Sequence, residues 1–423
     1  MIAILRRLKR KPVVKNIGPG LITGAAGDDP SGIATYSQAG AQFGFSMLWT
    51  VVITYPLMAA IQMVSARLGC MTGKGLAANI KEHFPAWILY GIVGALLVAN
   101  TINIAADIAA MGQAAQLILG GPPHLYSVAF GLVCLLLQVF LPYQTYVTYL
   151  KWLTLSLLSY VAVAFTVNVP WGQVLERIVL PHLPLDNTTV TMVVAVFGTT
   201  ISPYLFFWQA AQEMEDLRAV RAKSDAPLAL RAARKHMRRI RWDTYVGMGF
   251  SNLVAFFIIL STAATLHVAG ITSIETSAQA AEALRPVAGE AAFALFAAGI
   301  IATGMLAVPV LAGSAAYAVA ETFRWRTGLD LRLNEGKEFY SIVAFATLAG
   351  TALNFTHLDP IKALFWSAVI NGVIAVPIMA VMMILGGRKT VMGQYTFRKN
   401  LTRLGWASTV VMAIAVVAMF ATL

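Results

Sequence analysis

The chain of 423 residues has few charged side chains and almost no cysteine. Only 12% of its residues are charged and 58% are hydrophobic, with a mean hydropathy of +0.71. Soluble proteins carry about 25% charged residues, so this composition excludes an ordinary soluble enzyme and predicts a polytopic membrane protein. The two cysteines, Cys70 and Cys134, fall in or beside apolar segments without metal-ligand spacing, and we interpret both as packing residues.

Motifs of other function classes are missing as well. None of the six histidines stands near another His or Cys at ligand spacing, so no zinc site is expected. There is no Walker A sequence, which argues against transport driven by the chain's own nucleotide hydrolysis. The basic N-terminal run leads into an apolar segment without the small-residue pattern of a cleavable signal peptide. We therefore expect neither an enzyme nor a bound cofactor.

Apolar stretches of roughly 18–25 residues recur along the chain, which is the length that crosses a bilayer as a helix. We count about eleven of them, near residues 17–43, 46–66, 86–112, 124–141, 146–167, 190–212, 244–266, 291–317, 338–355, 362–385 and 404–422. The sequence thus predicts an all-α membrane protein with a single transmembrane domain, residues 1–423.

The basic residues indicate how these spans are oriented. With the N-terminus in the cytoplasm and the spans alternating, all but three of the 31 Lys and Arg residues face the cytoplasm; the exceptions are Arg177, Arg285 and Lys362. This asymmetry is typical of an inner or plasma membrane protein. It predicts a cytoplasmic N-terminus and places Leu423 outside.

The net charge of +12 is concentrated in part between Arg218 and Arg241, which hold nine Lys or Arg residues and one acid, Asp225. A nucleic-acid surface would be basic in this way, but a segment beside anionic lipid headgroups, or a solvated orientation signal, explains the pattern better in a membrane protein. We expect membrane lipids, and no nucleic acid, as partners.

The first apolar stretch is interrupted by two carboxylates and a proline, Asp28-Asp29-Pro30, with glycines at positions 24, 27 and 32. A charged side chain in mid-membrane costs about 2.5–3.5 kcal/mol on insertion scales. Pro30 has no backbone N–H to donate, and unwound backbone survives at membrane depth only around a protein-lined or water-filled cavity. The stretch therefore predicts a broken helix that presents carbonyl and carboxylate oxygens to an ion.

The sixth apolar stretch is interrupted in the same way, by the hydroxyl-rich segment 198–204 that contains Pro203. Interrupted helices at corresponding places in two halves of a chain are the best sequence indication of a transporter site. We expect a five-plus-five arrangement, with a first repeat over 17–167, a second over 190–385, and an extra peripheral helix at 404–422.

Two further polar positions lie inside apolar stretches. Asn100, Asn103 and Asp107 recur every three to four residues and share one helical face. Hydrogen bonding between helices explains buried asparagines, whereas an intramembrane carboxylate usually faces a transport pathway, and we assign Asp107 to the site. Asn371 is the strongly polar residue inside the tenth stretch, and Asp359, at the mouth of that stretch, is interpreted as a helix cap.

The residues of the first stretch resemble a known signature. Gly18-Pro19-Gly20, Asp29-Pro30, Thr35 and Gln38-Ala39-Gly40-Ala41 resemble the first helix of the Nramp family of divalent metal transporters. The resemblance implies the LeuT-type fold, with inverted repeats of five helices and broken first and sixth helices.

The chain departs from the family's pattern at the residues that bind metal and carry protons. The family's first-helix asparagine corresponds to Gly32, and its sixth-helix methionine to Ser202. Tyr204 and Gln209 replace two histidines, and Thr199 replaces an alanine whose carbonyl reaches the ion. An acidic residue on the third helix is lost to Ala110, and the ninth helix has no internal arginine.

These losses favour hard cations, because a thioether ligand selects Mn²⁺ and Fe²⁺ and oxygen ligands do not. Mg²⁺ keeps several waters and is held by one or two carboxylates, so the site resembles that of the magnesium-transporting branch of Nramp-related proteins. We expect a secondary transporter or facilitator of Mg²⁺ without strict proton coupling. The expected metal-site residues are Asp29 as direct or water-mediated ligand, backbone carbonyls at Gly27 and Thr199, Ser202, Asn371, a cavity widened at Gly32, and the nearby charges of Asp28 and Asp107.

Three alternatives stay open. A proton-coupled Mn²⁺ or other transition-metal transporter would tolerate Ser202. A carrier of a small organic substrate would use an aromatic-lined pocket, which Tyr204, Phe206, Phe207 and Trp208 are able to supply, since one fold hosts many substrates. A membrane sensor would bind without transporting. In addition, a helix N-cap for the inner half-helix is the plain structural interpretation of Asp28 and Asp29.

Overall fold

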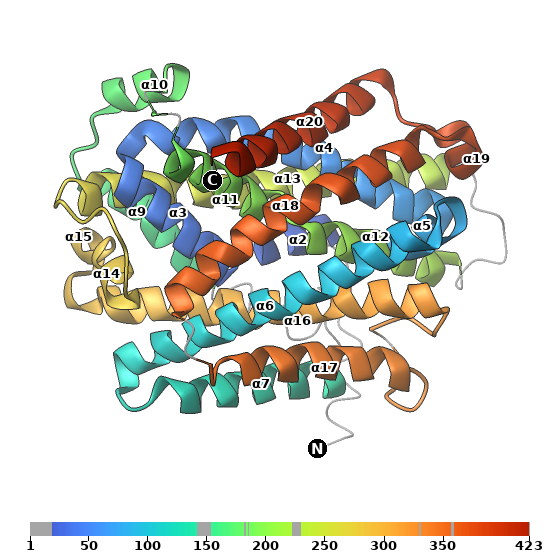
Figure 1. Cartoon of the computed structure of the whole chain (residues 1–423), viewed down its shortest axis with the longest axis horizontal. Helices are drawn as coiled ribbons and strands as arrows, with labels where there is room; N and C mark the ends of the chain where they lie inside the picture. Colours follow the sequence, from blue (N-terminus) through green and yellow to red (C-terminus); the bar gives the residue numbers. More distant parts are fainter. Residues whose placement is uncertain are drawn as a thin grey trace.

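The computed structural model describes residues 19–141, 154–181, 183–184, 186–221, 230–329, 331–356 and 359–422, and within these ranges it contains helices and no strand (Figure 1). The first half contains α2 (Pro19–Gly27), α3 (Pro30–Phe43), η2 (Gly44–Met47), α4 (Leu48–Thr72), α5 (Leu76–His83), α6 (Ala86–Leu119), α7 (Pro123–Phe140), η3 (Thr154–Leu157), α9 (Leu158–Thr166) and α10 (Trp171–Val179). The second half contains α11 (Asn187–Thr200), α12 (Pro203–Arg221), α13 (Leu230–Thr262), the π-helical turn η4 (Ala263–His267), α14 (Ser277–Glu282), α15 (Arg285–Ala288), η5 (Gly289–Ala291), α16 (Ala292–Phe323), α17 (Lys337–Leu353), α18 (Pro360–Gly387), α19 (Lys389–Met392), η6 (Gly393–Tyr395) and α20 (Lys399–Thr422).

Both predicted helix breaks are confirmed. The first span stops at Gly27 and restarts at Pro30, and the sixth stops at Thr200 and restarts at Pro203. Each proline is the first residue of its half-helix, where its missing N–H and fixed φ cost nothing. The same residue cannot continue a preceding helix, which explains why the breaks fall where the sequence predicts them.

The predicted spans also match the structure. Eight helical runs among the described residues are long and apolar enough to cross a membrane. One of them, Pro30–Thr72, joins parts of the first two predicted stretches, while α9 and α17 are shorter than a full span. Residues 146–153 of the fifth stretch lie outside the described residues, as do 222–229 in the predicted basic segment. The repeat boundaries and the orientation in the membrane stay predictions.

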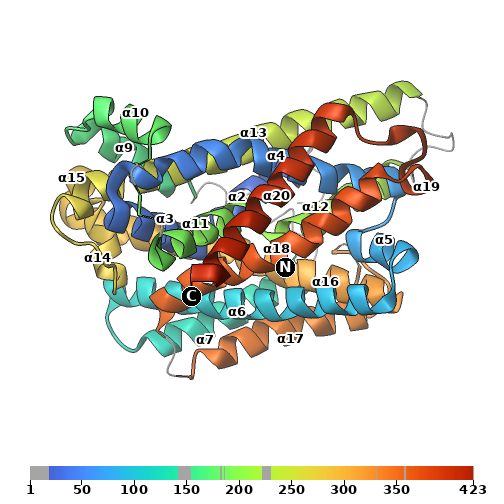
Figure 2. The ribbon, with the colours of Figure 1, turned by 45° about the horizontal axis from the view of Figure 1, so that its top comes forward.

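The long helices lie in groups that views from two directions agree on. Helices α6, α7, α16 and α17 lie side by side along one flank and contact one another (Figures 1 and 2). On the opposite side α20 crosses α18 and α4. The broken helix α2–α3 lies between these groups and packs along α13.

Two close backbone approaches depend on glycine. A side chain at Gly24 would overlap the backbone of Gly247, so α2 and α13 pack backbone to backbone. A side chain at Gly198 would overlap the Ala368 carbonyl and the backbone of Gly372, so α11 meets α18 in the same manner. Small residues allow such contacts between membrane helices, and here they bring both broken helices close to their neighbours.

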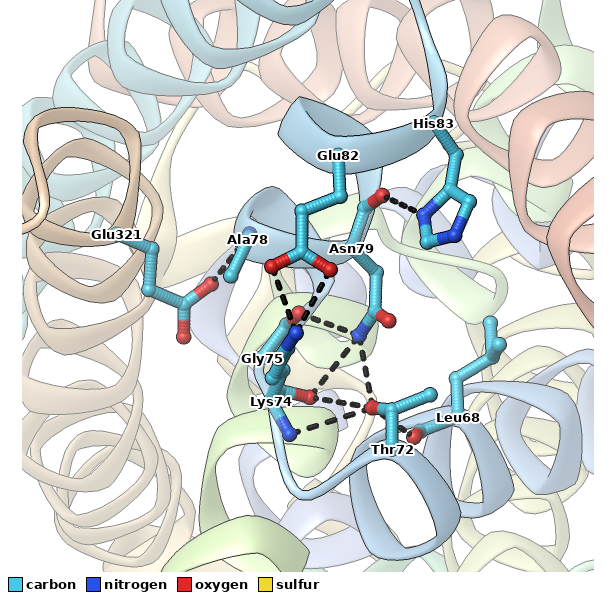
Figure 3. A network of polar contacts seen from close by, with 9 residues as sticks. All are labelled: Leu68, Thr72, Lys74, Gly75, Ala78, Asn79, Glu82, His83 and Glu321. Atoms are coloured by element: carbon cyan, nitrogen blue, oxygen red, sulfur yellow. Dashed lines mark hydrogen bonds and ion pairs between the residues drawn. The ribbon is translucent and has the colours of Figure 1, made fainter. Parts of the chain in front are cut away.

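The short helix α5 is fixed between α4 and α16 by the polar contacts of Figure 3. Glu321 of α16 accepts a hydrogen bond from the Ala78 backbone N–H in the first turn of α5 (3.1 Å), where a carboxylate satisfies a free helix N–H. Asn79 donates to the Gly75 carbonyl (2.8 Å), and Lys74 pairs with Glu82 (2.6 Å). The connection between the second and third spans is therefore an ordered part of the fold.

Candidate metal centre

Asp29 lies at the break between α2 and α3 and is 2% exposed. It is the N-cap residue of α3, and its Oδ1 accepts the Gly32 backbone N–H at 2.7 Å. The positive end of the α3 dipole and this hydrogen bond stabilise a carboxylate that burial alone would disfavour. The other oxygen, Oδ2, faces side chains from two other helices.

Those side chains are Asn103 of α6 and Tyr204 of α12. Asn103 donates from Nδ2 to Asp29 Oδ2 at 3.0 Å, and Tyr204 directs its hydroxyl at the same oxygen at 3.3 Å. The Tyr204 hydroxyl also lies 3.1 Å from the Ala26 carbonyl oxygen, near the end of α2. The amide oxygen of Asn103 is buried and has no hydrogen-bond partner among the described residues, so it remains an available oxygen ligand beside Asp29.

Asp28, whose charge the sequence assigned to the site, points away from this cluster. Its Oδ1 accepts a hydrogen bond from the Ser251 hydroxyl of α13 at 2.8 Å, and its buried Oδ2 has no partner among the described residues. The N-cap interpretation of the acidic pair needs a correction. It holds for Asp29 but not for Asp28: Asp29 caps α3, because the cap must directly precede the prolyl N1 residue, Pro30.

Asp107 of α6 is fully buried one turn beyond Asn103. Neither of its carboxylate oxygens has a hydrogen-bond partner among the described residues, although it lies within electrostatic reach of Asp29 and of the Ser31 backbone N–H. Asn100, on the same face, instead donates to the Leu311 carbonyl of α16 (2.8 Å). The polar face of α6 is thus divided, with Asn100 holding two helices together and the other two residues turned toward the helix break.

The sixth-span residues lie on the other side of Asp29. A side-chain carbon at Gly32 would be 3.0 Å from Thr199 Oγ1 and 3.4 Å from Asp29 Oδ1, so the end of α11 and the cap of α3 are adjacent. The Ser202 hydroxyl donates to the carbonyls of Gly198 (2.9 Å) and Thr199 (2.8 Å) at the end of α11. Ser202 therefore satisfies free helix carbonyls, while its lone pairs remain able to accept or to ligate.

Two predicted residues are less directly connected to Asp29. Gly27 ends α2, next to Leu205 and Ser251. Asn371 is buried in α18, next to the close contact between α11 and α18, and its amide oxygen has no partner among the described residues. The structure places Asn371 in the core that supports the break without giving it a contact with Asp29. Asp359 is confirmed as the N-cap of α18, accepting the Ile361 N–H at 3.0 Å.

Sequence reasoning missed the roles of Asn103 and Tyr204 at Asp29. The helical spacing placed Asn103 on the correct face of α6, and Tyr204 stood at a position of the family's pattern, so both signals were present. The four aromatic side chains considered for an organic-substrate pocket are instead packed against other residues. Tyr204 is turned to Asp29, and Phe206, Phe207 and Trp208 are fully buried, with Trp208 edge-to-face on Tyr317 at 6.3 Å between ring centroids.

A cavity of about 740 Å³ with a mixed polar and apolar lining opens between α3, α11, α18 and the loop before α14. It reaches Ala34 in the second turn of α3, the helix that Asp29 caps. Its polar lining includes Gln38, Glu275 and Asp359.

The possible metal ligands around the break are carboxylate, amide, hydroxyl and backbone oxygens. No group of three His, Cys, Asp or Glu side chains suited to a metal occurs in the described ranges.

Comparisons with known proteins agree with this architecture. The sequence profile described as "Natural resistance-associated macrophage protein-like" (Nramp) matches residues 20–422. The chain is 27% identical over 414 residues to the divalent metal cation transporter MntH of Burkholderia ambifaria, covering 93% of this chain and 86% of that relative. It is 30% identical over 320 residues to MntH of Yersinia pestis, covering 71% of each protein.

Solved structures show the same fold. The manganese transporter of Eremococcus coleocola, crystallised with an aromatic bis-isothiourea compound, superposes with a TM-score of 0.71 at 17% identity, over 95% of this chain and 86% of that one. MhsT, crystallised with L-phenylalanine, superposes with a TM-score of 0.61 at 12% identity, over 95% and 98% of the two chains. With the profile match over nearly its whole length, the chain belongs to the Nramp family, on the LeuT-type fold that the resemblance of its first helix implied.

Proposed function

We propose that the protein is a secondary transporter of divalent metal cations, with Mn²⁺ as its substrate. The observation that carries the proposal is the buried carboxylate of Asp29, held at a helix break with the Asn103 amide and the Tyr204 hydroxyl against it. A buried charge in a membrane protein marks an ion pathway unless a partner neutralises it, and Asp29 forms no ion pair with a described cationic side chain. The relatives named for divalent metals and manganese support the same substrate class.

Mg²⁺, the substrate expected from the sequence, has less support, because the relatives are named for manganese or for divalent metals in general. One observation still favours it as the second candidate. Ser202 stands where the family has a thioether. The atoms near Asp29 that are able to ligate a metal are oxygens, which discriminate little between Mn²⁺ and Mg²⁺. We propose that the Asn103 amide oxygen takes over the role of the amide lost at Gly32.

We also propose that transport is not strictly coupled to protons. Gln209, at the position of a family histidine, belongs to a neutral network: it accepts from Gln62 (2.6 Å) and donates to the Thr244 hydroxyl (3.1 Å). Ala110 likewise has no titratable group. Proton relays in membranes run through Asp, Glu and His chains, and neither Gln209 nor Ala110 supplies such a group.

Both proposals are tested in proteoliposomes that contain a pH dye. We expect saturable uptake of Mn²⁺, competition by Mg²⁺, no uptake of an amino-acid mixture, and no acidification in proportion to the metal. Uptake of Mg²⁺ that excess Mn²⁺ fails to inhibit would favour the second candidate. Stoichiometric acidification would contradict the absence of coupling and would direct attention to Asp107. Metal binding without any uptake would favour a sensor.

Asn103→Ala is expected to raise the KM for Mn²⁺ uptake by about 10- to 100-fold. Removing a group that orients or supplements a metal ligand has effects of this size. The matched control is Asn100→Ala, three residues away on the same face, whose amide bonds to α16 instead. It should lower thermal stability and leave KM near the wild-type value. Equal KM changes in the two variants would show that Asn103 acts only through packing.

A further inference from the structure

Three arginines from separate parts of the chain flank one small core. Arg67 of α4 follows Ala66, Arg241 of α13 follows Ile240, and Arg398 directly precedes α20, whose Leu401 packs against the same core. The charges of Arg241 and Arg398 act on that of Arg67. The Nε atom of Arg67 is buried and has no hydrogen-bond partner among the described residues. We call these three residues the arginine cluster.

The protein leaves the charge of the arginine cluster uncompensated. None of the three arginines forms an ion pair with an acidic side chain in the described ranges. The acidic residues nearby along α12 are engaged by another arginine, because Arg239 binds Glu213 at 2.9 Å and Asp216 at 2.8 Å. Like charges near one another repel, so the arginine cluster attracts an anion from outside the chain, and the exposed Arg241 and Arg398 are accessible to it.

Apolar side chains lie beneath and beside the arginine cluster. Under it, α4, α13 and α20 meet in a small core formed by Met63, Ala66, Cys70 and Ile240, with Met237 and Leu401 against it. Figure 2 shows α20 crossing α4 beside α13. Next to Arg241, Trp242 is 59% exposed and Tyr245 38% exposed, and such aromatic side chains are typical of the headgroup level of a bilayer.

We propose that the arginine cluster is a binding site for the phosphate of an anionic phospholipid. Guanidinium groups bind phosphate oxygens in a bidentate manner, and basic pockets between membrane helices on the cytoplasmic side recognise lipid headgroups. The exposed Trp242 and Tyr245 give the acyl chains an apolar surface beside the phosphate, which a free inorganic phosphate would not use. The site lies at the end that the positive-inside pattern assigns to the cytoplasm.

The test uses the full-length protein in nanodiscs of phosphatidylglycerol or of phosphatidylcholine, with lipid retention read by native mass spectrometry after transfer to detergent. The test variant is Arg67→Gln/Arg241→Gln/Arg398→Gln. The matched control is Arg324→Gln/Arg326→Gln/Arg332→Gln, which removes the same charge from exposed positions between α16 and α17. Wild type and control should retain phosphatidylglycerol, and the test variant should retain at least about tenfold less of it.

Retention by the test variant at the wild-type level, or an equal loss in the control, would overturn the proposal. A further arm adds inorganic phosphate to the detergent-solubilised protein; stabilisation by phosphate equal to that by phosphatidylglycerol would show a free-anion site instead. If the triple variant does not fold, Arg398→Gln alone is used as the test variant, because this residue lies before the start of α20 and its substitution should not disturb folding. It should lower retention measurably, and no change would contradict the proposal.

Discussion

Asp29→Asn is expected to reduce saturable Mn²⁺ uptake by more than about 100-fold, beyond the 10- to 100-fold effect of removing an outer partner of a metal ligand. Asparagine has nearly the shape of aspartate and is an equally good N-cap, so the hydrogen bond from Gly32 and the start of α3 are retained. What is lost is the negative charge. Carbonyl, amide and hydroxyl oxygens alone leave a divalent cation poorly compensated in a site of low dielectric constant.

The matched control for this change is Asp186→Asn. Asp186 is also a helix N-cap, accepting the Thr189 N–H at 2.9 Å at the start of α11, but it is exposed. It should leave uptake unchanged in the same proteoliposomes. Normal uptake by Asp29→Asn, with a reconstituted amount equal to wild type, would place the metal site elsewhere, and Asp107 would be the next residue to change.

Gly198→Ala is expected to destabilise the protein strongly and to lower uptake. The new methyl group would overlap the Ala368 carbonyl and the backbone of Gly372, neither of which is a flexible side chain able to move aside. Overpacking of this kind costs about 1–3 kcal/mol, and more where backbone must move. Because the Gly198 carbonyl accepts the Ser202 hydroxyl at 2.9 Å, the displacement would also reach the end of α11 beside Asp29.

The measurement is the midpoint of thermal unfolding in detergent, which should fall by about 1–3 °C, and by more where the backbone must move. Gly94→Ala is the control, because Gly94 lies in α6 and a side chain there meets no atom within 4 Å. Its midpoint should not fall. An unchanged midpoint for Gly198→Ala would mean that α11 and α18 are farther apart than the structure places them.

The sequence by itself determined the spans, the two helix breaks and the central carboxylate, because these depend on local chemistry. Long apolar stretches must cross the bilayer as helices, and a proline at the start of a half-helix ends the one before it wherever the chain then folds. The Nramp resemblance rested on the same local residues, Asp29-Pro30 and their glycine-rich surroundings, and the profile match confirmed it.

The tertiary structure decided which side chains meet at the break. Asn103 reaches Asp29 across 74 residues, Tyr204 across 175, and Ser251 reaches Asp28 across 223. The helical period places Asn100 and Asn103 on one face of α6, but it does not indicate which of them faces a packed helix and which faces the helix break. That choice follows from how α6 lies against α16 and α3, which is set by the close packing of many side chains rather than by any local pattern.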